Sequence, residues 1–234
     1  MNSIIFNSDS IAIIISICTF VFSIFKFYQQ DKINNKYEQA KFANQQNLKN
    51  YSIYIDNKHK RLIQVNDNLV TALGHVNDVS SVLQQKRYYD KYSVSQIAKY
   101  VDELKVNDDE KNSIISLLTT DKSAAIEKIY YWEDKIRCYE AKRLITNFRQ
   151  SLLNARLYIS EENYLTIDSF SVDLLDVVIL VEDYNTNIYT HPNPNIYPDL
   201  ISLQIEKVEK INNKFDDIIE IMRKELDYSN ENKK

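Results

Sequence analysis

The stretch LKNYSIYIDNKHKRLIQVNDNLVTALGHVNDVSSVL, residues 48–83, places an apolar residue at every seventh position. Because an α-helix has about 3.6 residues per turn, these residues share one side of a helix and form a seam for packing another helix. Neighbouring apolar residues widen the stripe, which favours a helix of a bundle over a bare two-stranded coiled coil. The seam residues are Leu48, Ile55, Leu62, Leu69, Val76 and Leu83.

Two residues depart from this pattern. Lys58 stands three residues after Ile55, where the repeat calls for an apolar side chain. Gly74 is the only glycine of the chain and lies inside the predicted helix, where glycine costs about 1 kcal/mol relative to alanine. Close approach of a neighbouring helix is the simplest reason for a glycine here, so we expect a helix–helix contact at Gly74.

The composition of the chain predicts an all-α fold. Its 234 residues include one glycine and three prolines, so the turn residues that β-hairpins and barrels need are almost missing. The net charge of −4 argues against general nucleic-acid binding, because neutralising phosphates needs a basic surface. Cys18 and Cys138 form neither a disulfide framework nor a zinc motif.

Upstream of the seam, residues 11–25 have the uncharged sequence IAIIISICTFVFSIF. A helix over residues 10–28 is about 28 Å long, close to the roughly 30 Å thickness of a bilayer's hydrocarbon core. The first ten residues hold no lysine or arginine and no small-residue cleavage site follows, which disfavours a secretory signal peptide. The sequence therefore predicts a transmembrane helix at 10–28, after a short segment at 1–9.

The charges beside this helix predict its orientation. Residues 26–49 contain five lysines and two acidic residues, whereas the other side has only the amino group and Asp9. Lysines favour the cytoplasmic side, so we expect the N-terminus outside the cell membrane and the helical body in the cytoplasm. Residues 29–47 should form a polar helical stalk, residues 48–228 an antiparallel helical bundle, and residues 229–234 a polar tail.

The predicted transmembrane helix also has a face of small side chains. These residues are spaced four, three and four apart, so they share one side of the helix. Two such faces could approach closely and associate within the membrane. Alternatively, their hydroxyl groups bond back to carbonyls of their own helix. The candidate self-association face consists of Ala12, Ser16, Thr19 and Ser23.

Capping patterns divide the remaining chain into helices. Residues 86–92 (KRYYDKY) interrupt the apolar repeat and are predicted to be a loop. A second loop is expected at 191–198, because its prolines cannot continue a helix. A side chain able to cap the following helix precedes four of the expected helices. The caps are Ser93, Asn107, Asp121 and Ser160, and the helices cover 93–104, 107–118, 122–159, 161–184 and the segment from Pro198.

Charge separates two neighbouring helices. Lys122–Arg156 has eight basic and four acidic residues, and Leu157–Glu206 has nine acidic residues and no lysine or arginine. The acidic stretch, 161–206, is either a docking surface for a basic partner or the internal partner of the basic helix, 122–158. The short turn at Ser160 favours internal pairing, because it makes the two helices antiparallel neighbours. We expect Arg149 near Asp168 or Asp173, Arg143 near Asp176, and Arg137 near Glu182.

Catalytic and metal motifs do not stand out. Glycine scarcity excludes the P-loop and the dinucleotide fingerprint. None of the three histidines lies in an H-E-x-x-H motif, and none follows an arginine at the spacing of HEPN-type ribonucleases. His75 with Asp78 could supply two metal ligands, but a solvated pair is far commoner. We predict no catalytic, cofactor-binding or metal residues, no cofactor and no enzymatic activity.

Two tyrosine pairs, Tyr88–Tyr89 and Tyr130–Tyr131, could be binding aromatics. The chain has 17 tyrosines, however, so such pairs are weak evidence for a site. No small-molecule substrate is identified from these residues.

Short segments resemble a known group of proteins. With the N-terminal anchor and stalk, the segments Lys58–Leu62, Arg156–Ser160 and Met222–Leu226 make the chain similar to a loose group of uncharacterised single-pass, membrane-anchored helical proteins of low-GC bacteria and their phages. The resemblance implies an architecture and carries no activity with it.

The sequence thus predicts a membrane-anchored helical scaffold or interaction protein, such as a host or phage defence component, that acts by protein contacts. Its expected partners are the lipid bilayer and a protein or a second copy of the chain, with no nucleic acid. The alternative is a membrane-perturbing, pore-type effector whose cytoplasmic helices restrain it.

Overall fold

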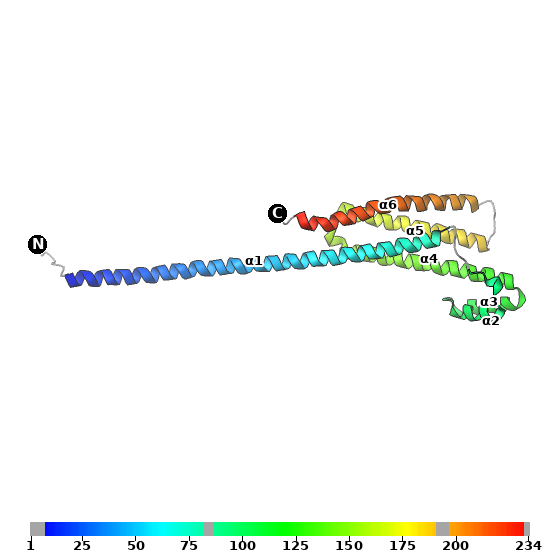
Figure 1. Ribbon diagram of the computed structural model, residues 1–234, viewed down its shortest axis with the longest axis horizontal. Coiled ribbons are helices and arrows are strands. Elements are labelled where there is room, and N and C mark those ends of the chain that lie inside the picture. Colours follow the sequence, from blue (N-terminus) through cyan, green and yellow to red (C-terminus); the bar gives the residue numbers. More distant parts are fainter. Residues whose placement is uncertain (1–7, 82–86, 191–196, 232–234) are drawn as a thin grey trace. The chain divides into compact units, whose positions relative to one another are not determined.

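The computed structural model describes the backbone of residues 8–81, 87–190 and 197–231, and the side chains of residues 19–81, 87–190 and 198–227. This described part contains six α-helices and two short 3₁₀ helices and no strand, which confirms the all-α prediction (Figure 1). The chain divides by its contacts into two units, residues 1–56 and 57–234.

The first unit consists of the N-terminal part of helix α1 (Ser8–Ser80). Its described side chains, residues 19–56, are exposed except for the half-buried Ile55. Among the side chains that the structure describes, no helix offers a stretch apolar and long enough to cross a membrane. The structure therefore gives no support to the predicted transmembrane helix, and residues 10–18 of that prediction lie outside the described side chains.

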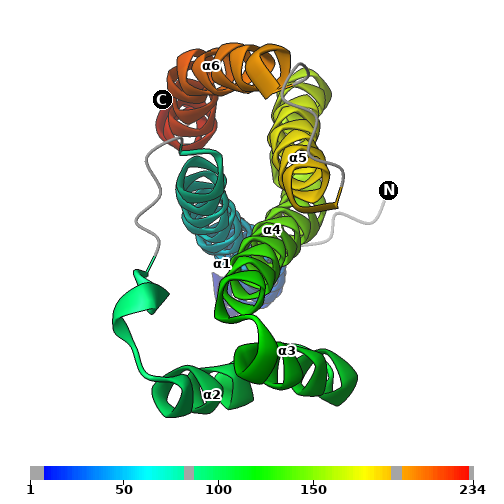
Figure 2. The same ribbon diagram turned by 90° about the vertical axis from the view of Figure 1, so that its right-hand side faces the viewer.

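Four helices form a bundle in the second unit: residues 57–80 of α1, α4 (Lys122–Ala155), α5 (Glu161–Thr190) and α6 (Tyr197–Glu231). Figure 2 shows them around a common interior, and α5 lies antiparallel to both α4 and α6. Each fully buried aliphatic or aromatic side chain contributes roughly 1.5–3 kcal/mol relative to its exposed state. The largest in this core include Leu62, Leu69, Ile145, Phe148, Leu152, Ile167, Phe170, Leu174 and Ile211.

A second, smaller core lies beside the N-terminal half of α4. It is covered by a 3₁₀ helix η1 (Tyr89–Lys91), α2 (Val94–Glu103) and α3 (Asp108–Thr120). Its buried residues are Tyr89, Ile97, Val101, Leu104, Ile114, Leu118, Ala125, Ile126 and Ile129. The basic helix α4 therefore takes part in both cores, with its first turns in the small core and its later turns in the bundle.

The predicted caps begin their helices. Ser93 and Gln96 form a complete capping box at α2, and Asn107 accepts a hydrogen bond from the Glu110 N–H at α3. Asp121 accepts from the Ala124 N–H at α4, and the Ser160 hydroxyl accepts from the Asn163 N–H at α5. Each cap satisfies an N–H that has no partner in the helix itself.

Helix ends differ slightly from the prediction. Helix α4 ends at Ala155 and continues as a 3₁₀ turn, η2 (Arg156–Tyr158), before α5 begins. Helix α5 extends to Thr190, one further turn and more beyond the expected end at 184. The predicted loop at 191–198 lies outside the described backbone for residues 191–196, and α6 begins at Tyr197.

The predicted seam is placed in different surroundings along α1. Leu62, Leu69 and Val76 are fully buried in the bundle core, whereas Leu48 is exposed in the first unit. Leu83 lies outside the described residues. Helix α1 ends at Ser80, where the Gln204 amide of α6 donates a hydrogen bond to the Ser80 carbonyl at 2.6 Å.

The expected contact at Gly74 is wrong. Gly74 is exposed, and a Cβ atom built on it would meet no other atom within 4 Å. It follows the buried Val65 by nine residues, a rotation of about 180° around the helix, so it faces away from the core. No neighbouring helix within the described chain explains this glycine.

Candidate interaction surface

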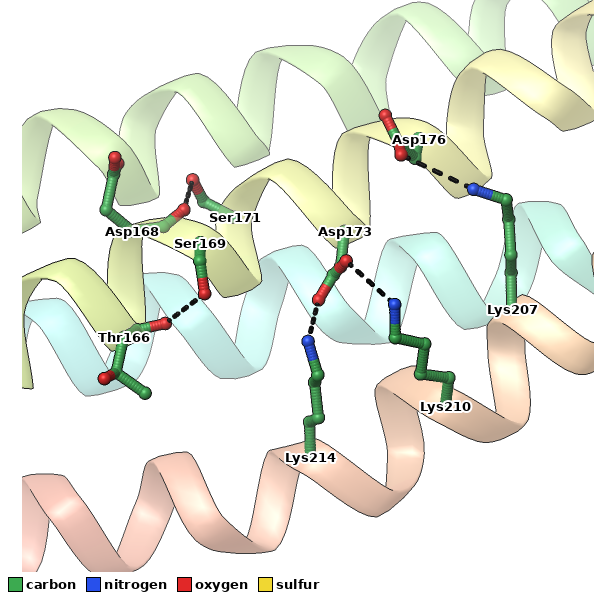
Figure 3. Close-up of polar contacts among 9 residues, drawn as sticks. All are labelled: Thr166, Asp168, Ser169, Ser171, Asp173, Asp176, Lys207, Lys210 and Lys214. Atoms are coloured by element: carbon green, nitrogen blue, oxygen red, sulfur yellow. Dashed lines mark hydrogen bonds and ion pairs between the residues drawn. The ribbon is translucent and has the colours of Figure 1, made fainter.

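The acidic helix α5 is paired with lysines and arginines of both neighbouring helices. On the α4 side, Arg149 contacts Asp168 at 3.3 Å and Lys142 pairs with Glu182. On the α6 side, Lys207, Lys210 and Lys214 reach two aspartates, as Figure 3 shows. The distances are 3.4 Å for Lys207–Asp176, 3.6 Å for Lys210–Asp173 and 2.5 Å for Lys214–Asp173.

These pairs bear on the question that the sequence left open, whether the acidic stretch docks a partner or pairs internally. The expected proximity of Arg149 to Asp168 is confirmed. The expected pairing of Arg143 with Asp176 is wrong, because Arg143 pairs with Glu140 in its own helix. Glu182, expected near Arg137, pairs with Lys142. Much of the acidic stretch therefore holds α5 between α4 and α6.

Asp173 is the most strongly paired of these acids. Its burial alone would raise the pKa of its carboxyl group, but the hydrogen bond and charge of Lys214 and the charge of Lys210 outweigh burial and leave the pKa below its ordinary value. Most of the other pairs are half exposed, and such pairs contribute only about 0.2–1 kcal/mol each. They fix the register of the helices more than they stabilise the fold.

Glu225 joins three parts of the bundle. Its carboxylate accepts hydrogen bonds from the Ser160 N–H at 3.0 Å and the Asn163 amide at 2.7 Å. Lys58, whose side chain is buried, lies 3.7 Å away on α1. Burial would raise the pKa of Glu225, but these hydrogen bonds and the Lys58 charge hold the pKa below its ordinary value. The interruption of the seam at Lys58 is thus an ion pair inside the bundle.

A cluster of tyrosines surrounds Glu133 in the smaller core. The phenols of Tyr89 and Tyr100 both donate hydrogen bonds to the Glu133 carboxylate. The Tyr89 ring lies 5.3 Å from Tyr100 and 5.5 Å from Tyr130, centroid to centroid. Burial, followed by the bonds to Glu133, raises the pKa of both phenols. They therefore stay protonated and act as structural donors.

The two predicted tyrosine pairs are split by the fold. Tyr89 is buried while Tyr88 is exposed. Tyr130 faces Tyr89, whereas Tyr131 lies 5.6 Å from Tyr189 of α5 in an edge-to-face contact. Neither pair forms a binding platform of two adjacent rings. Tyr130 and Tyr131 are consecutive residues of α4 and point in directions about 100° apart, and Tyr88 lies outside η1, in which Tyr89 is the first residue.

An open hollow of about 280 Å³ lies beside this cluster. It is lined by Arg87, Tyr89, Tyr92, Gln96, Ile97, Lys99, Tyr100 and Glu103. The Arg87 guanidinium sits 4.9 Å above the Tyr100 ring, and the two inner phenols are bonded to Glu133. The charged residues of its lining are Arg87, Lys99 and Glu103, so charges of both signs are present and favour no particular class of ligand.

The remaining candidates for chemistry are engaged or buried. The His75 ring contacts the Thr71 carbonyl of its own helix at 3.1 Å, and burial raises the pKa of the Cys138 thiol to about 12. Among the described side chains, no three His, Cys, Asp or Glu residues are grouped to hold a metal ion. His191 lies outside the described residues.

The predicted self-association face is described only at its second half. The Ser23 hydroxyl donates a hydrogen bond to the Thr19 carbonyl at 2.8 Å. This is the arrangement in which the hydroxyl bonds back to its own helix. The side chains of Ala12 and Ser16 lie outside the described residues.

The outer face of α5 carries the candidate interaction surface. Leu165, Val172 and Ile179 are seven residues apart and are 56%, 45% and 41% exposed. Residues spaced seven apart share one side of a helix. Asp176 and Asp183 follow Val172 and Ile179 by four residues and lie on the same side. We call these five residues the α5 stripe.

Sequence reasoning missed the α5 stripe. Helix α5 is so rich in apolar residues that the exposed set is hidden beside the buried one, which includes Phe170, Leu174, Val177 and Val181. The heptad spacing of 165, 172 and 179 was nevertheless available in the sequence as a second, offset repeat. A similar but shorter set, Ile63 and Val70, is exposed on α1.

Comparisons of the chain with protein-family models, with curated proteins and with solved structures found no match.

Proposed function

We propose that this chain is a membrane-anchored helical interaction protein, with its bundle in the cytoplasm, that acts through protein contacts. The observation that carries the proposal is the α5 stripe, a row of exposed aliphatic side chains on a helix whose other sides are packed. Exposed apolar rows of this kind mark contact sites more often than isolated exposed residues do.

The polar groups of the bundle support a role in binding over a role in catalysis. Glu225 and Glu133 each accept two hydrogen bonds from groups of other elements, and these bonds keep the elements together. The donors to these two carboxylates are groups of the fold itself, so both carboxylates act as structural acceptors.

The membrane part of the proposal rests on sequence. Residues 10–25 carry no charge, and five lysines follow within residues 26–49. Lysines beside a span favour the cytoplasmic side, which places the bundle in the cytoplasm and the N-terminus outside. The lysines could also contact anionic lipid, at about 1 kcal/mol each near the surface.

The test combines a contact probe with a topology probe. A photo-crosslinking amino acid at position 172 of the full chain, expressed in cells, should yield discrete protein adducts after irradiation. The same amino acid at position 147, an exposed polar site on α4, should not. A reporter active only outside the cytoplasm, fused after Lys234, should be silent. Absence of adducts at 172 would refute action by protein contact through the α5 stripe, and an active reporter would reverse the orientation.

A further inference from the structure

We infer that the α5 stripe docks a basic amphipathic helix of another protein, with aliphatic side chains at heptad spacing. This inference rests on the proposed function and names the class of partner. Its starting point is geometry: Leu165, Val172 and Ile179 span two full heptads on one open side of a regular helix. A helix laid along them would present its own aliphatic residues at the same spacing.

Charge decides what kind of helix fits. Helix α5 contains seven acidic residues and no lysine or arginine. Within the stripe itself, every charged residue is therefore negative, and Asp176 and Asp183 alternate with the aliphatic side chains. A partner that places lysine or arginine beside its aliphatic residues meets a carboxylate at each of these steps.

The ion pairs within the bundle leave the acidic residues of the stripe exposed. Arg149 and Lys142 approach α5 from the α4 side, and the three lysines of α6 approach from the other side. Asp183 makes no ion pair within the part of the chain that the structure describes. Asp176 is paired with Lys207 at 3.4 Å, and half of its side-chain surface is still exposed. Basic side chains of the bundle thus border the stripe, and acidic ones lie inside it.

A second copy of the same stripe fits poorly. In an antiparallel pair centred on Val172, Asp176 of one copy would face Asp168 of the other. In a parallel pair, Asp176 would face its own equivalent. Like charges placed opposite each other disfavour association, so the stripe selects against itself and in favour of a basic helix.

The test uses the full chain in a zwitterionic detergent and two synthetic helical peptides. Both peptides carry leucine at heptad spacing, one with lysine and the other with glutamate at the flanking positions. Fluorescence anisotropy should show binding of the lysine peptide, weakened by added salt because the flanking charges are exposed. The glutamate peptide should bind at least about tenfold more weakly.

Matched variants separate the stripe from general stickiness. Val172→Asn with Ile179→Asn should weaken binding of the lysine peptide by about tenfold or more. The control pair Ile63→Asn with Val70→Asn changes the same two residue types, at the same spacing and at 54% and 49% exposure on α1, and should alter binding by less than about twofold. Thermal melts by circular dichroism check that both pairs remain folded.

A second pair of variants tests charge without touching the apolar contact. Asp176→Asn with Asp183→Asn should weaken the lysine peptide severalfold and flatten its salt dependence. Asp108→Asn with Asp109→Asn removes the same charge from α3 and should leave binding unchanged. Equal binding of the two peptides, or an unchanged affinity of the stripe variants, would overturn the inference. Sedimentation showing self-association that Val172→Asn abolishes would assign the stripe to a second copy and overturn it as well.

The two experiments separate the proposed contact function of α5 from the inferred class of partner. If cellular adducts form at position 172 but the peptides do not discriminate by charge, the partner class is wrong and contact through α5 stands. If no adduct forms at 172, the proposed contact function of the α5 stripe is refuted whatever the peptides do.

Discussion

At the scale of single residues, Gly74 has no structural reason within the described chain, since a Cβ atom there meets nothing within 4 Å. We therefore expect Gly74→Ala to raise the free energy of unfolding by about 1 kcal/mol, the difference in helix propensity between the two residues. Urea denaturation followed by circular dichroism measures it. Gln64→Ala, at another exposed position of α1, should change stability by only a few tenths of a kcal/mol. A loss of stability in Gly74→Ala would indicate a partner helix at this site.

The pair Lys58–Glu225 should respond asymmetrically to substitution. Glu225→Ala leaves the buried Lys58 without its partner and removes the acceptor of two hydrogen bonds, so we expect a loss of about 2–4 kcal/mol. Lys58→Met puts an apolar side chain at a seam position and leaves Glu225 with its two donors. That variant should lie within about 1 kcal/mol of the wild type. Equal losses in the two variants would mean that the charge pair itself is the dominant interaction.

Glu225 also predicts a response to pH. Its pKa in the folded chain is lowered from the ordinary value of 4.5, so its contribution to stability is full above that value. The contribution is lost as the pH falls through the folded pKa, because the unfolded chain then binds the proton more readily. Denaturation midpoints measured from pH 6 downward should fall less steeply for Glu225→Gln than for the wild type. Parallel curves would contradict the assignment.

At the scale of elements, Glu133 connects α2 and η1 to α4 through Tyr100 and Tyr89. Glu133→Ala removes the acceptor of two phenols, at a cost of about 1 kcal/mol or more for each. Because these contacts belong to the smaller core, hydrogen exchange should become faster in α2 and α3 and remain unchanged in α5 and α6. Glu140→Ala, which removes a carboxylate paired with Arg143 of its own helix, is the control. Uniformly faster exchange would mean that the two cores unfold together.

Features that depend on residues close in the sequence could be predicted, whereas contacts between distant segments could not. Caps such as Ser93 and Asn107 act on N–H groups three residues away, so their helices were found at the correct starts. The partner of Lys58 is a residue on the last helix, and no local pattern identifies it. The pairing of Lys142 with Glu182 depends on how two helices are rotated about their axes, which counting back from a turn does not give. The α5 stripe was obscured for a related reason, since the buried and exposed apolar rows overlap in the sequence.

At the scale of the whole molecule, both cores are built from residues after position 57: the first buried apolar residue of the bundle is Leu62. A fragment of residues 57–234 should therefore fold alone and melt within about 3 °C of the full chain, since it keeps all the buried apolar residues that the structure describes in the two cores. Starting the fragment at Val70 instead removes Leu62, Val65 and Leu69, which are fully buried, and should abolish cooperative melting.

Cell fractionation then tests the proposed anchor with the same two proteins, the full chain and the 57–234 fragment. The full chain should be recovered with membranes and released by detergent but not by high salt. Residues 10–25 would be held in the lipid by apolar contacts, which salt does not screen. The 57–234 fragment should stay in the supernatant. Recovery of both proteins in the supernatant would refute the anchor without affecting the proposals about the bundle and its α5 stripe. Release of the full chain by salt would mean that its lysines alone hold it at the membrane surface.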